Sequence, residues 1–219
     1  MTWDWQYAWS IMPALLSGVR ETFVVTLAAG ALALGLGMLI AVAGWFAPGR
    51  VKLLVRGFVE LARGLPILVL LFFAFYALPQ YGVVLSPYTT GVLVLGVVYG
   101  AYCSEVYRGG IVSLPRGMWD ACAALNLPRR TTWARVILPM VVRNSVGALG
   151  AYIIVIYKQT ALLVTIGVPV LLTTAQTAGY ASYRYLEPYT LAGVLYLLLN
   201  LPSMWMVRAL ERRVARGGF

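Results

Sequence analysis

The sequence contains no histidine, only two cysteines and only seven acidic residues among 219. Without histidine, no Ser/His/Asp triad can form, and the few carboxylates and thiols give neither paired catalytic carboxylates nor zinc-site spacing. Cys103 and Cys122 have no spacing that predicts a disulfide or a metal site, so we interpret them as small buried residues. These absences argue against an enzyme, and no metal or other cofactor is expected.

The phosphate-binding loop Gly-x-x-x-x-Gly-Lys-Ser/Thr is also absent from the chain. The chain therefore cannot bind ATP through such a loop. If ATP drives its function, a partner protein has to bind the nucleotide.

Apolar residues are abundant: they make up 61% of the chain, and the mean hydropathy is +0.83. A soluble domain has apolar residues at about half of its positions, and a helix needs roughly 20 mainly apolar residues to cross a bilayer. We therefore predict an all-α integral membrane protein with one transmembrane domain over residues 1–219. The five predicted spans are about 22–46, 57–79, 88–112, 141–168 and 188–209.

The net charge is +10, with 17 basic residues. These residues fall in short segments between apolar runs, which is the signal of the cytoplasmic side rather than of nucleic-acid binding. One side of the five-span arrangement has only Arg20 and Arg184, which predicts an external N-terminus and a cytoplasmic C-terminus. The other side collects Arg50, Lys52, Arg56, Arg63, Arg116, Arg129, Arg130, Arg135, Arg143, Arg208, Arg212, Arg213 and Arg216.

Residues 1–18 are rich in tryptophan and too short to span, so we expect a separate N-terminal interfacial helix. They lack the basic start of a signal peptide, and the first span is expected to direct insertion. Gly30, Gly35 and Gly37 predict close helix packing in that span. Pro66 predicts either a kink in the second span or its start.

The connection 114–140 is polar and helix-like, and by its charge it is cytoplasmic. We expect Asp120 to favour the N-terminal end of a short helix with small residues on its surface. Asn126 tolerates the left-handed conformation that ends helices, and Pro128 reinforces the stop. Such a helix is typical of a segment that another protein binds.

This connection resembles the EAA loop of permease subunits of ATP-binding cassette importers. That loop has an acid, two small residues, a glycine six positions after the acid, and a hydrophobic-x-Leu-Pro ending. Asp120, Cys122 and Asn126 replace the usual Glu, Ala and Gly. The resemblance implies a coupling helix that binds the ATPase through Trp119, Asp120, Ala121, Cys122, Ala124, Leu125, Asn126 and Pro139.

Three further segments resemble the polar amino acid uptake branch of these importers: 60–73 (ELARGLPILVLLFF), 101–111 (AYCSEVYRGGI), and 157–162 (YKQTAL) with 166–168 (IGV). Leu70 departs from the branch, where many members have glutamine, and the nearest likeness is to the group that takes up ectoine-type compatible solutes. The resemblance implies a bacterial inner-membrane importer with a second permease subunit, an ATPase dimer and an extracytoplasmic solute-binding protein.

Ionisable residues inside a membrane are costly and therefore point to function. Glu105 and Arg108 lie three residues apart on one helix face, so they form either a structural pair or a substrate contact. Lys158 faces either a cavity or Glu105 on a neighbouring helix. The predicted substrate pathway thus includes Glu105, Arg108, Lys158, Gln159 and Thr160.

Two other functions stay open at this point. A self-sufficient channel or secondary transporter would need its own pore or coupling-ion site, and the five spans show no internal inverted repeat. A membrane scaffold could use the basic segments to bind partners or anionic lipids.

Overall fold

The structure is a computed structural model that describes residues 3–216, and the described part is helical, without strands. Residues 1–2 of the predicted N-terminal segment and residues 217–219 lie outside it. In chain order the elements are α1 (Trp5–Phe46), α2 (Gly49–Gly64), α3 (Ile67–Phe72), η1 (Phe73–Ala77), η2 (Leu78–Tyr81), α4 (Pro87–Val112), α5 (Arg116–Ala124), α6 (Arg129–Thr131), η3 (Thr132–Ile137), α7 (Leu138–Gln159), η4 (Thr160–Ile166), α8 (Leu171–Ser182) and α9 (Leu186–Arg216).

Four helical stretches of the described residues are long and apolar enough to cross a membrane: Trp5–Phe46, Pro87–Val112, Arg129–Ile166 and Leu186–Val214. A fifth span results only if the bent pair Gly49–Gly64 and Ile67–Tyr81 is taken as one. The prediction of an all-helical membrane protein is confirmed, with four to five candidate spans.

The N-terminal segment differs from the prediction because it is not a separate helix. Residues 5–17 are the first turns of α1, which runs unbroken for 42 residues. The Asp4 carboxylate accepts hydrogen bonds from the backbone N–H groups of Gln6 and Tyr7 and thereby caps this helix. Ala8, Ile11 and Leu15 are buried, so packing along one face stabilises the extension.

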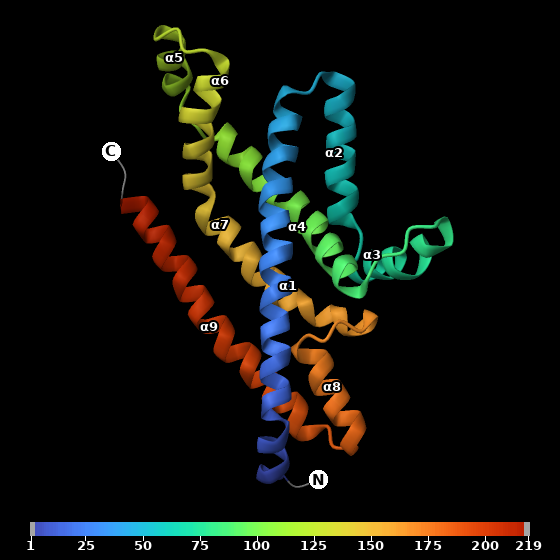
Figure 1. Cartoon of the computed structure of the whole chain (residues 1–219). Coiled ribbons are helices and arrows are strands. Elements are labelled where there is room, and N and C mark those ends of the chain that lie inside the picture. Colours follow the sequence, from blue (N-terminus) through green and yellow to red (C-terminus); the bar gives the residue numbers. More distant parts are fainter. Residues whose placement is uncertain (1–2, 217–219) are drawn as a thin grey trace.

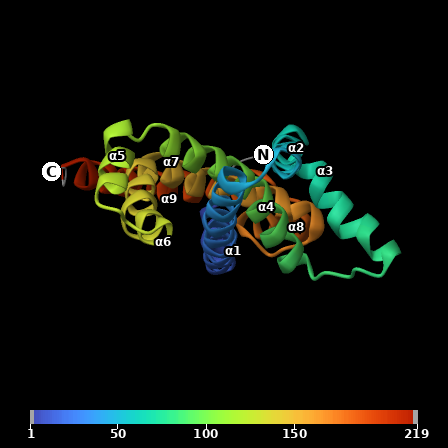
Figure 2. The same ribbon diagram turned by 90° about the horizontal axis from the view of Figure 1, so that it is seen from above.

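The predicted second span, 57–79, is not straight. Its two helices meet at an angle of 102°. The bend falls at Leu65, whose backbone is extended (φ −90°, ψ 140°), and α3 begins directly after Pro66. Because proline disfavours the helical conformation in the residue before it, the kink is the outcome here. Seen from above, α3 and the segments after it project away from α1 (Figure 2).

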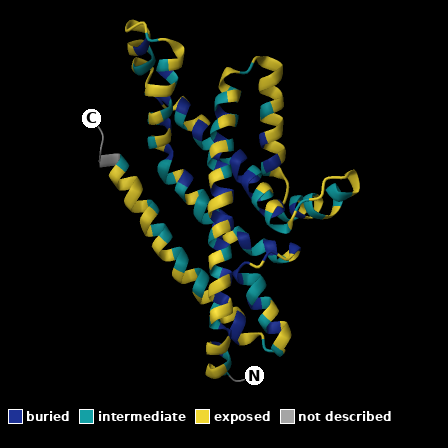
Figure 3. Cartoon of the chain, in the orientation of Figure 1, coloured by how far each residue is buried: buried dark blue, intermediate teal, exposed yellow. Residues whose placement is uncertain are grey.

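α4 is the centre of the packing, and 61% of its most apolar stretch is buried, against 6% for that of α9. It pairs most extensively with α1. Gly37 of α1 lies against Gly100 and Cys103 of α4 so closely that an added Cβ would be 2.7 Å from the Cys103 Cβ. Figure 3 shows the contrast between the buried interior around α1 and α4 and the exposed length of α9.

The predicted fourth span, 141–168, contains α7 and the tighter η4, which ends at Gly167 with φ +76°. After it comes α8, a twelve-residue helix that was not predicted. No side chain of its own caps α8; instead the backbone N–H of Leu171 donates to the buried Thr22 hydroxyl of α1 at 3.0 Å. This bond fixes α8 against the first helix.

The elements divide between two ends of the molecule (Figure 1). The turn from α1 to α2 lies at the same end as α5 and α6, whereas the N-terminus and α8 lie at the opposite end. Most of the basic residues that predicted the cytoplasmic side therefore belong to one end of the fold.

Candidate functional site

The short helix in the 114–140 connection is α5, and it begins earlier than expected. Pro115 precedes its first residue, Arg116, so Asp120 lies in the middle of the helix and does not cap it. Proline at this boundary has a fixed φ and no N–H to leave unsatisfied, which makes it a natural helix start. The predicted N-terminal role of Asp120 is therefore wrong, although its carboxylate is exposed.

The end of α5 follows the prediction. Asn126 is left-handed, with φ 49°. Its N–H donates to the Ala123 carbonyl at 2.9 Å, and the Leu127 N–H donates to the Cys122 carbonyl at 3.1 Å. These two bonds form a Schellman motif, in which asparagine takes the position that glycine usually occupies.

The two faces of α5 differ sharply. Cys122 is buried, with 7% of its surface exposed, and Trp119 and Met118 are half-buried. Leu125 is 72% exposed, although exposure of leucine is unfavourable in water. The outward face presents one carboxylate, small side chains and an apolar tip: Asp120, Ala121, Ala123, Ala124, Leu125 and Asn126.

Four aromatic rings join α5 to α1 and η3. Trp119 stacks on Trp45, with centroids 6.0 Å apart and planes 8° apart. Trp133 of η3 lies 5.9 Å from Trp119 and 4.7 Å from Phe46. Aromatic pairs at such distances add to stability beyond the area they bury. This aromatic cluster (Trp45, Phe46, Trp119 and Trp133) ties α5 to the end of α1.

The chain on each side of α5 continues directly into the core. Ile111 and Leu114, before α5, are buried, and so are Ile137 and Val141 after it. Pro139 is exposed near the start of α7, which continues η3 without a break in the helical backbone. A displacement of α5 would therefore act on both α4 and α7.

Glu105 and Arg108 form the predicted pair, with Arg108 Nη2 2.7 Å from Glu105 Oε2 and two further hydrogen bonds from Nε. They lie in a recess of about 170 Å³ between α1, α2 and α4, which we call the α1–α2–α4 recess. The residues that line it are Ile40, Ala41, Gly44, Trp45, Lys52, Val55, Arg56, Val59, Ser104, Glu105, Arg108 and Val112.

Lys158 lies elsewhere. It lines a second recess, of about 310 Å³, between the end of α7 and α9, together with Ala161, Tyr196, Leu197 and Asn200. Among the described residues, the ion pairs do not include Lys158, and Glu105 pairs with Arg108 instead. Lys158 therefore faces a cavity and not Glu105.

Gln159 and Thr160, which were predicted to belong to the pathway with Lys158, do not line its recess. The Thr160 side chain is buried, and its hydroxyl donates to the Tyr157 carbonyl at 2.6 Å. Gln159 is half-buried and is not among the residues that line the Lys158 recess. The structure therefore places Lys158, but not Gln159 or Thr160, in the lining of this recess.

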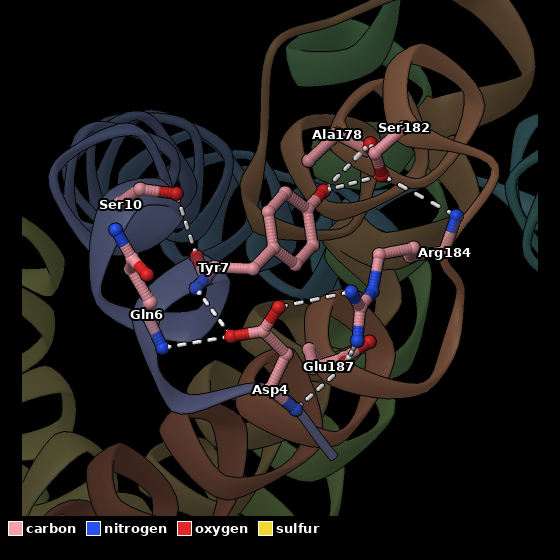
Figure 4. A network of polar contacts seen from close by, with 8 residues as sticks. All are labelled: Asp4, Gln6, Tyr7, Ser10, Ala178, Ser182, Arg184 and Glu187. Carbon is pink, nitrogen blue, oxygen red and sulfur yellow. Dashed lines mark hydrogen bonds and ion pairs between the residues drawn. The ribbon is translucent and has the colours of Figure 1, made fainter. Parts of the chain in front are cut away.

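The sequence reasoning missed a polar network at the other end of the molecule (Figure 4). Arg184 lies 3.0 Å from the Asp4 carboxylate and 2.6 Å from that of Glu187. The Tyr7 hydroxyl donates to the Ala178 carbonyl at 2.9 Å, and its ring lies under the Arg184 guanidinium. Glu187 is 1% exposed, so this network ties α1 to α8 and α9. In the sequence, the i, i+3 spacing of Arg184 and Glu187 could have indicated this ion pair.

Comparison with known proteins gives one family. A family model described as "Binding-protein-dependent transport system inner membrane component" matches residues 11–216. The chain is 34% identical over 222 residues to a probable amino-acid ABC transporter permease protein, y4tG, from Sinorhizobium fredii (strain NBRC 101917 / NGR234), with 99% of this chain and 96% of that protein covered.

Two further comparisons agree with this family. The chain is 34% identical over 220 residues to the glutamine transport system permease protein GlnP of Escherichia coli (strain K12), covering 98% of this chain and 99% of that one. A solved structure described as an amino acid ABC transporter with histidines has a TM-score of 0.89 and 30% identity, covering 97% of this chain and all of that one.

Proposed function

This chain belongs to the inner membrane components of binding-protein-dependent transport systems, and we propose that it moves a polar amino acid inward when partner ATPases act on α5. It is a multi-pass inner-membrane permease subunit of an amino-acid ABC importer, without an ATPase domain of its own. The energy for transport comes from outside the chain.

The observation that carries the proposal is the two-sided character of α5. Its outward face of small side chains and exposed Leu125 suits a shallow groove on another protein. Its inward face is held by Cys122 and by the stack of Trp119 on Trp45. A helix that is open to a partner on one side and packed into the permease on the other transmits the partner's movement to α4 and α7.

The full assembly that we propose has two permease subunits, two ATPase subunits and an external solute-binding protein. The family description supports a binding protein as a general partner. The basic end of the fold, which carries α5, faces the cytoplasm, and the N-terminus with α8 faces outside, in keeping with the positive-inside bias. The exposed faces of α1 and α9 are available to lipid and to the second permease.

For the substrate we propose a polar amino acid. The relatives reported above are named as amino-acid and glutamine permeases, so an ectoine-type solute gains no support from them. Leu70, where many members of the branch have glutamine, is half-buried in α3.

Within the chain, we assign the substrate contact to Lys158. Its ammonium group would pair with the carboxylate of an amino acid in the recess that it shares with Asn200. The Asn200 Oδ1 atom is buried without a hydrogen-bond partner and can accept a bond from the substrate ammonium group. The K158Q variant should then raise the substrate concentration for half-maximal uptake, whereas K158R should retain most of the uptake.

For Glu105 and Arg108 the geometry favours the structural alternative. Their bidentate pairing satisfies both charges within one helix, and they lie in a different recess from Lys158. The substrate pathway that we propose therefore centres on Lys158.

The test is reconstitution of the purified importer with its ATPase and binding protein into proteoliposomes, followed by uptake of labelled glutamine and other polar amino acids. We expect uptake that requires ATP and the binding protein. Uptake by the chain alone without ATP would instead identify a channel or secondary transporter. An assembled complex with ATPase activity but no uptake of any such solute would favour the scaffold.

A further inference from the structure

The α1–α2–α4 recess contains an excess of positive charge from one face of α2. Lys52, Arg56 and Arg63 recur at four- and seven-residue spacing and so share a face of the helix. Lys52 and Arg56 line the recess together with Arg108. The one carboxylate in the lining, Glu105, already pairs with Arg108.

Arg63 extends this basic face beyond the recess. Its guanidinium lies 5.2 Å from the centre of the Tyr102 ring, and its Nε atom is buried without a hydrogen-bond partner. Its nearest carboxylate, Glu60, lies 3.9 Å away and is 77% exposed, so that contact contributes little. Lys52 and Arg56 take part in none of the ion pairs of the described residues.

The outer face of α2 has the opposite character. Leu53 and Leu54 are 71% and 73% exposed, and Leu61 is 63% exposed. Lys52 and Arg56 thus lie on the side of α2 that borders the recess, whereas these leucines lie on the side that points away from it. An apolar outer face of this kind suits contact with lipid acyl chains.

The recess opens near the end of the molecule that we propose faces the cytoplasm. Lys52 is in the first turn of α2, next to the turn from α1, at the end of the molecule that carries α5. Trp45 is one of its lining residues, and tryptophan is favoured at the membrane interface. Apolar side chains also line it, among them Ile40, Val55 and Val59.

From these observations, we propose that the α1–α2–α4 recess binds the phosphate headgroup of an anionic phospholipid of the inner leaflet. Lys52 and Arg56 contact the phosphate oxygens, and the acyl chains extend from the recess along its apolar lining residues Ile40, Val55 and Val59. Basic pockets between membrane helices on the cytoplasmic side have the charge that such headgroups require. The proposal uses the orientation given above and does not depend on which amino acid is transported.

The test measures phosphatidylglycerol binding to the assembled importer by native mass spectrometry, over a titration of this lipid into neutral detergent. The recess variant is K52Q/R56Q, and the matched control is R50Q/R212Q, which removes the same charge from positions that do not line the recess. Since each basic group near such a headgroup contributes about 1 kcal/mol, the recess variant should bind roughly 25-fold more weakly. A charge-preserving K52R/R56K variant should bind nearly as the unaltered importer does, which separates lost charge from misfolding.

Three results would overturn the proposal. The first is that K52Q/R56Q retains phosphatidylglycerol as well as R50Q/R212Q does. The second is that inorganic phosphate displaces the lipid and gives its own mass shift, which would make the site one for a free anion. Loss of the ATPase subunits from K52Q/R56Q without loss of lipid would also contradict it, because an acidic surface of that partner would then cover the recess.

Discussion

Trp45 at the end of α1 and Trp119 in α5 stack with ring centroids 6.0 Å apart and an angle of 8° between their planes. The two residues are 74 positions apart in the sequence, so this contact joins the exposed α5 to the longest helix of the fold. Trp133 contacts both rings. A force on α5 therefore reaches α1 directly as well as α4 and α7 through the chain.

Replacement of Trp119 by alanine tests this link. An aromatic pair contributes about 0.5–1.5 kcal/mol beyond the area that it buries. The equilibrium constant for packing of α5 on α1 should therefore fall roughly 2- to 12-fold. We expect W119A to hydrolyse ATP in the assembled importer while the amount of amino acid moved per ATP falls. The control is W205A, because Trp205 is 69% exposed on α9 and lies outside the aromatic cluster. An equal loss of coupling in both variants would contradict the link.

Two glycines of α1 provide a matched test of the α1–α4 packing. An added Cβ at Gly37 would lie 2.7 Å from the Cys103 Cβ and 2.9 Å from the Gly100 carbonyl oxygen, whereas at Gly35 it would meet nothing within 4 Å. We expect G37A to destabilise the permease by about 1–3 kcal/mol, since neither neighbour can move cheaply. G35A should be neutral or stabilising by up to about 1 kcal/mol. Thermal unfolding of the purified importer measures both, and similar midpoints for the two variants would refute the packing.

The network at Asp4 predicts a dependence on pH. The hydrogen bond that the Tyr7 backbone N–H donates, together with the charge of Arg184 and the hydrogen bond from the Gln6 backbone, holds the pKa of the Asp4 carboxyl below its ordinary value of 3.8. A lowered pKa means that the ionised carboxylate stabilises the folded state above that ordinary value, and that this stability is lost as the pH falls through the lowered pKa. D4N retains the helix cap and removes only the charge.

The unaltered permease should therefore unfold at a higher temperature than D4N at neutral pH, and the difference should shrink as the pH falls below the ordinary carboxyl value. In an R184Q background the effect of D4N at neutral pH should be smaller, because Arg184 is the charged partner of Asp4. A difference between the two proteins that stays constant with pH would show that the charge does not contribute.

The sequence predicted the parts of the fold that depend on local rules. Runs of apolar residues located the long helices, and the tolerance of asparagine for a left-handed backbone predicted the end of α5 at Asn126. Local rules left the outcome at Pro66 open, because proline permits a kink as well as a helix start. The structure shows a bend of 102° at this position, a size that the sequence alone does not give.

Tertiary contacts explain what the sequence did not predict. α8 is too short for a span, and its position depends on distant contacts, such as the packing of Leu171 and Ala175 on Leu15 and the hydrogen bond from Leu171 to Thr22, which lies 149 residues earlier. Tertiary contacts also decide which of the predicted pathway residues lie close together. The sequence left open whether Lys158 faces a cavity or Glu105. In the structure, helix packing places the two residues in separate recesses. The continuity of α1 through residues 5–17 depends likewise on burial against α8 and α9.

The central claim is that partner ATPases drive this permease through the exposed face of α5. Its most direct test is ATP-dependent uptake by the reconstituted importer carrying D120K, with E60K as the control, since Glu60 is a similarly exposed carboxylate on α2. We predict that D120K inserts normally, binds the ATPase subunits weakly and loses uptake, while E60K transports as the unaltered importer does. Unchanged uptake by D120K would contradict the role of α5 as the coupling helix.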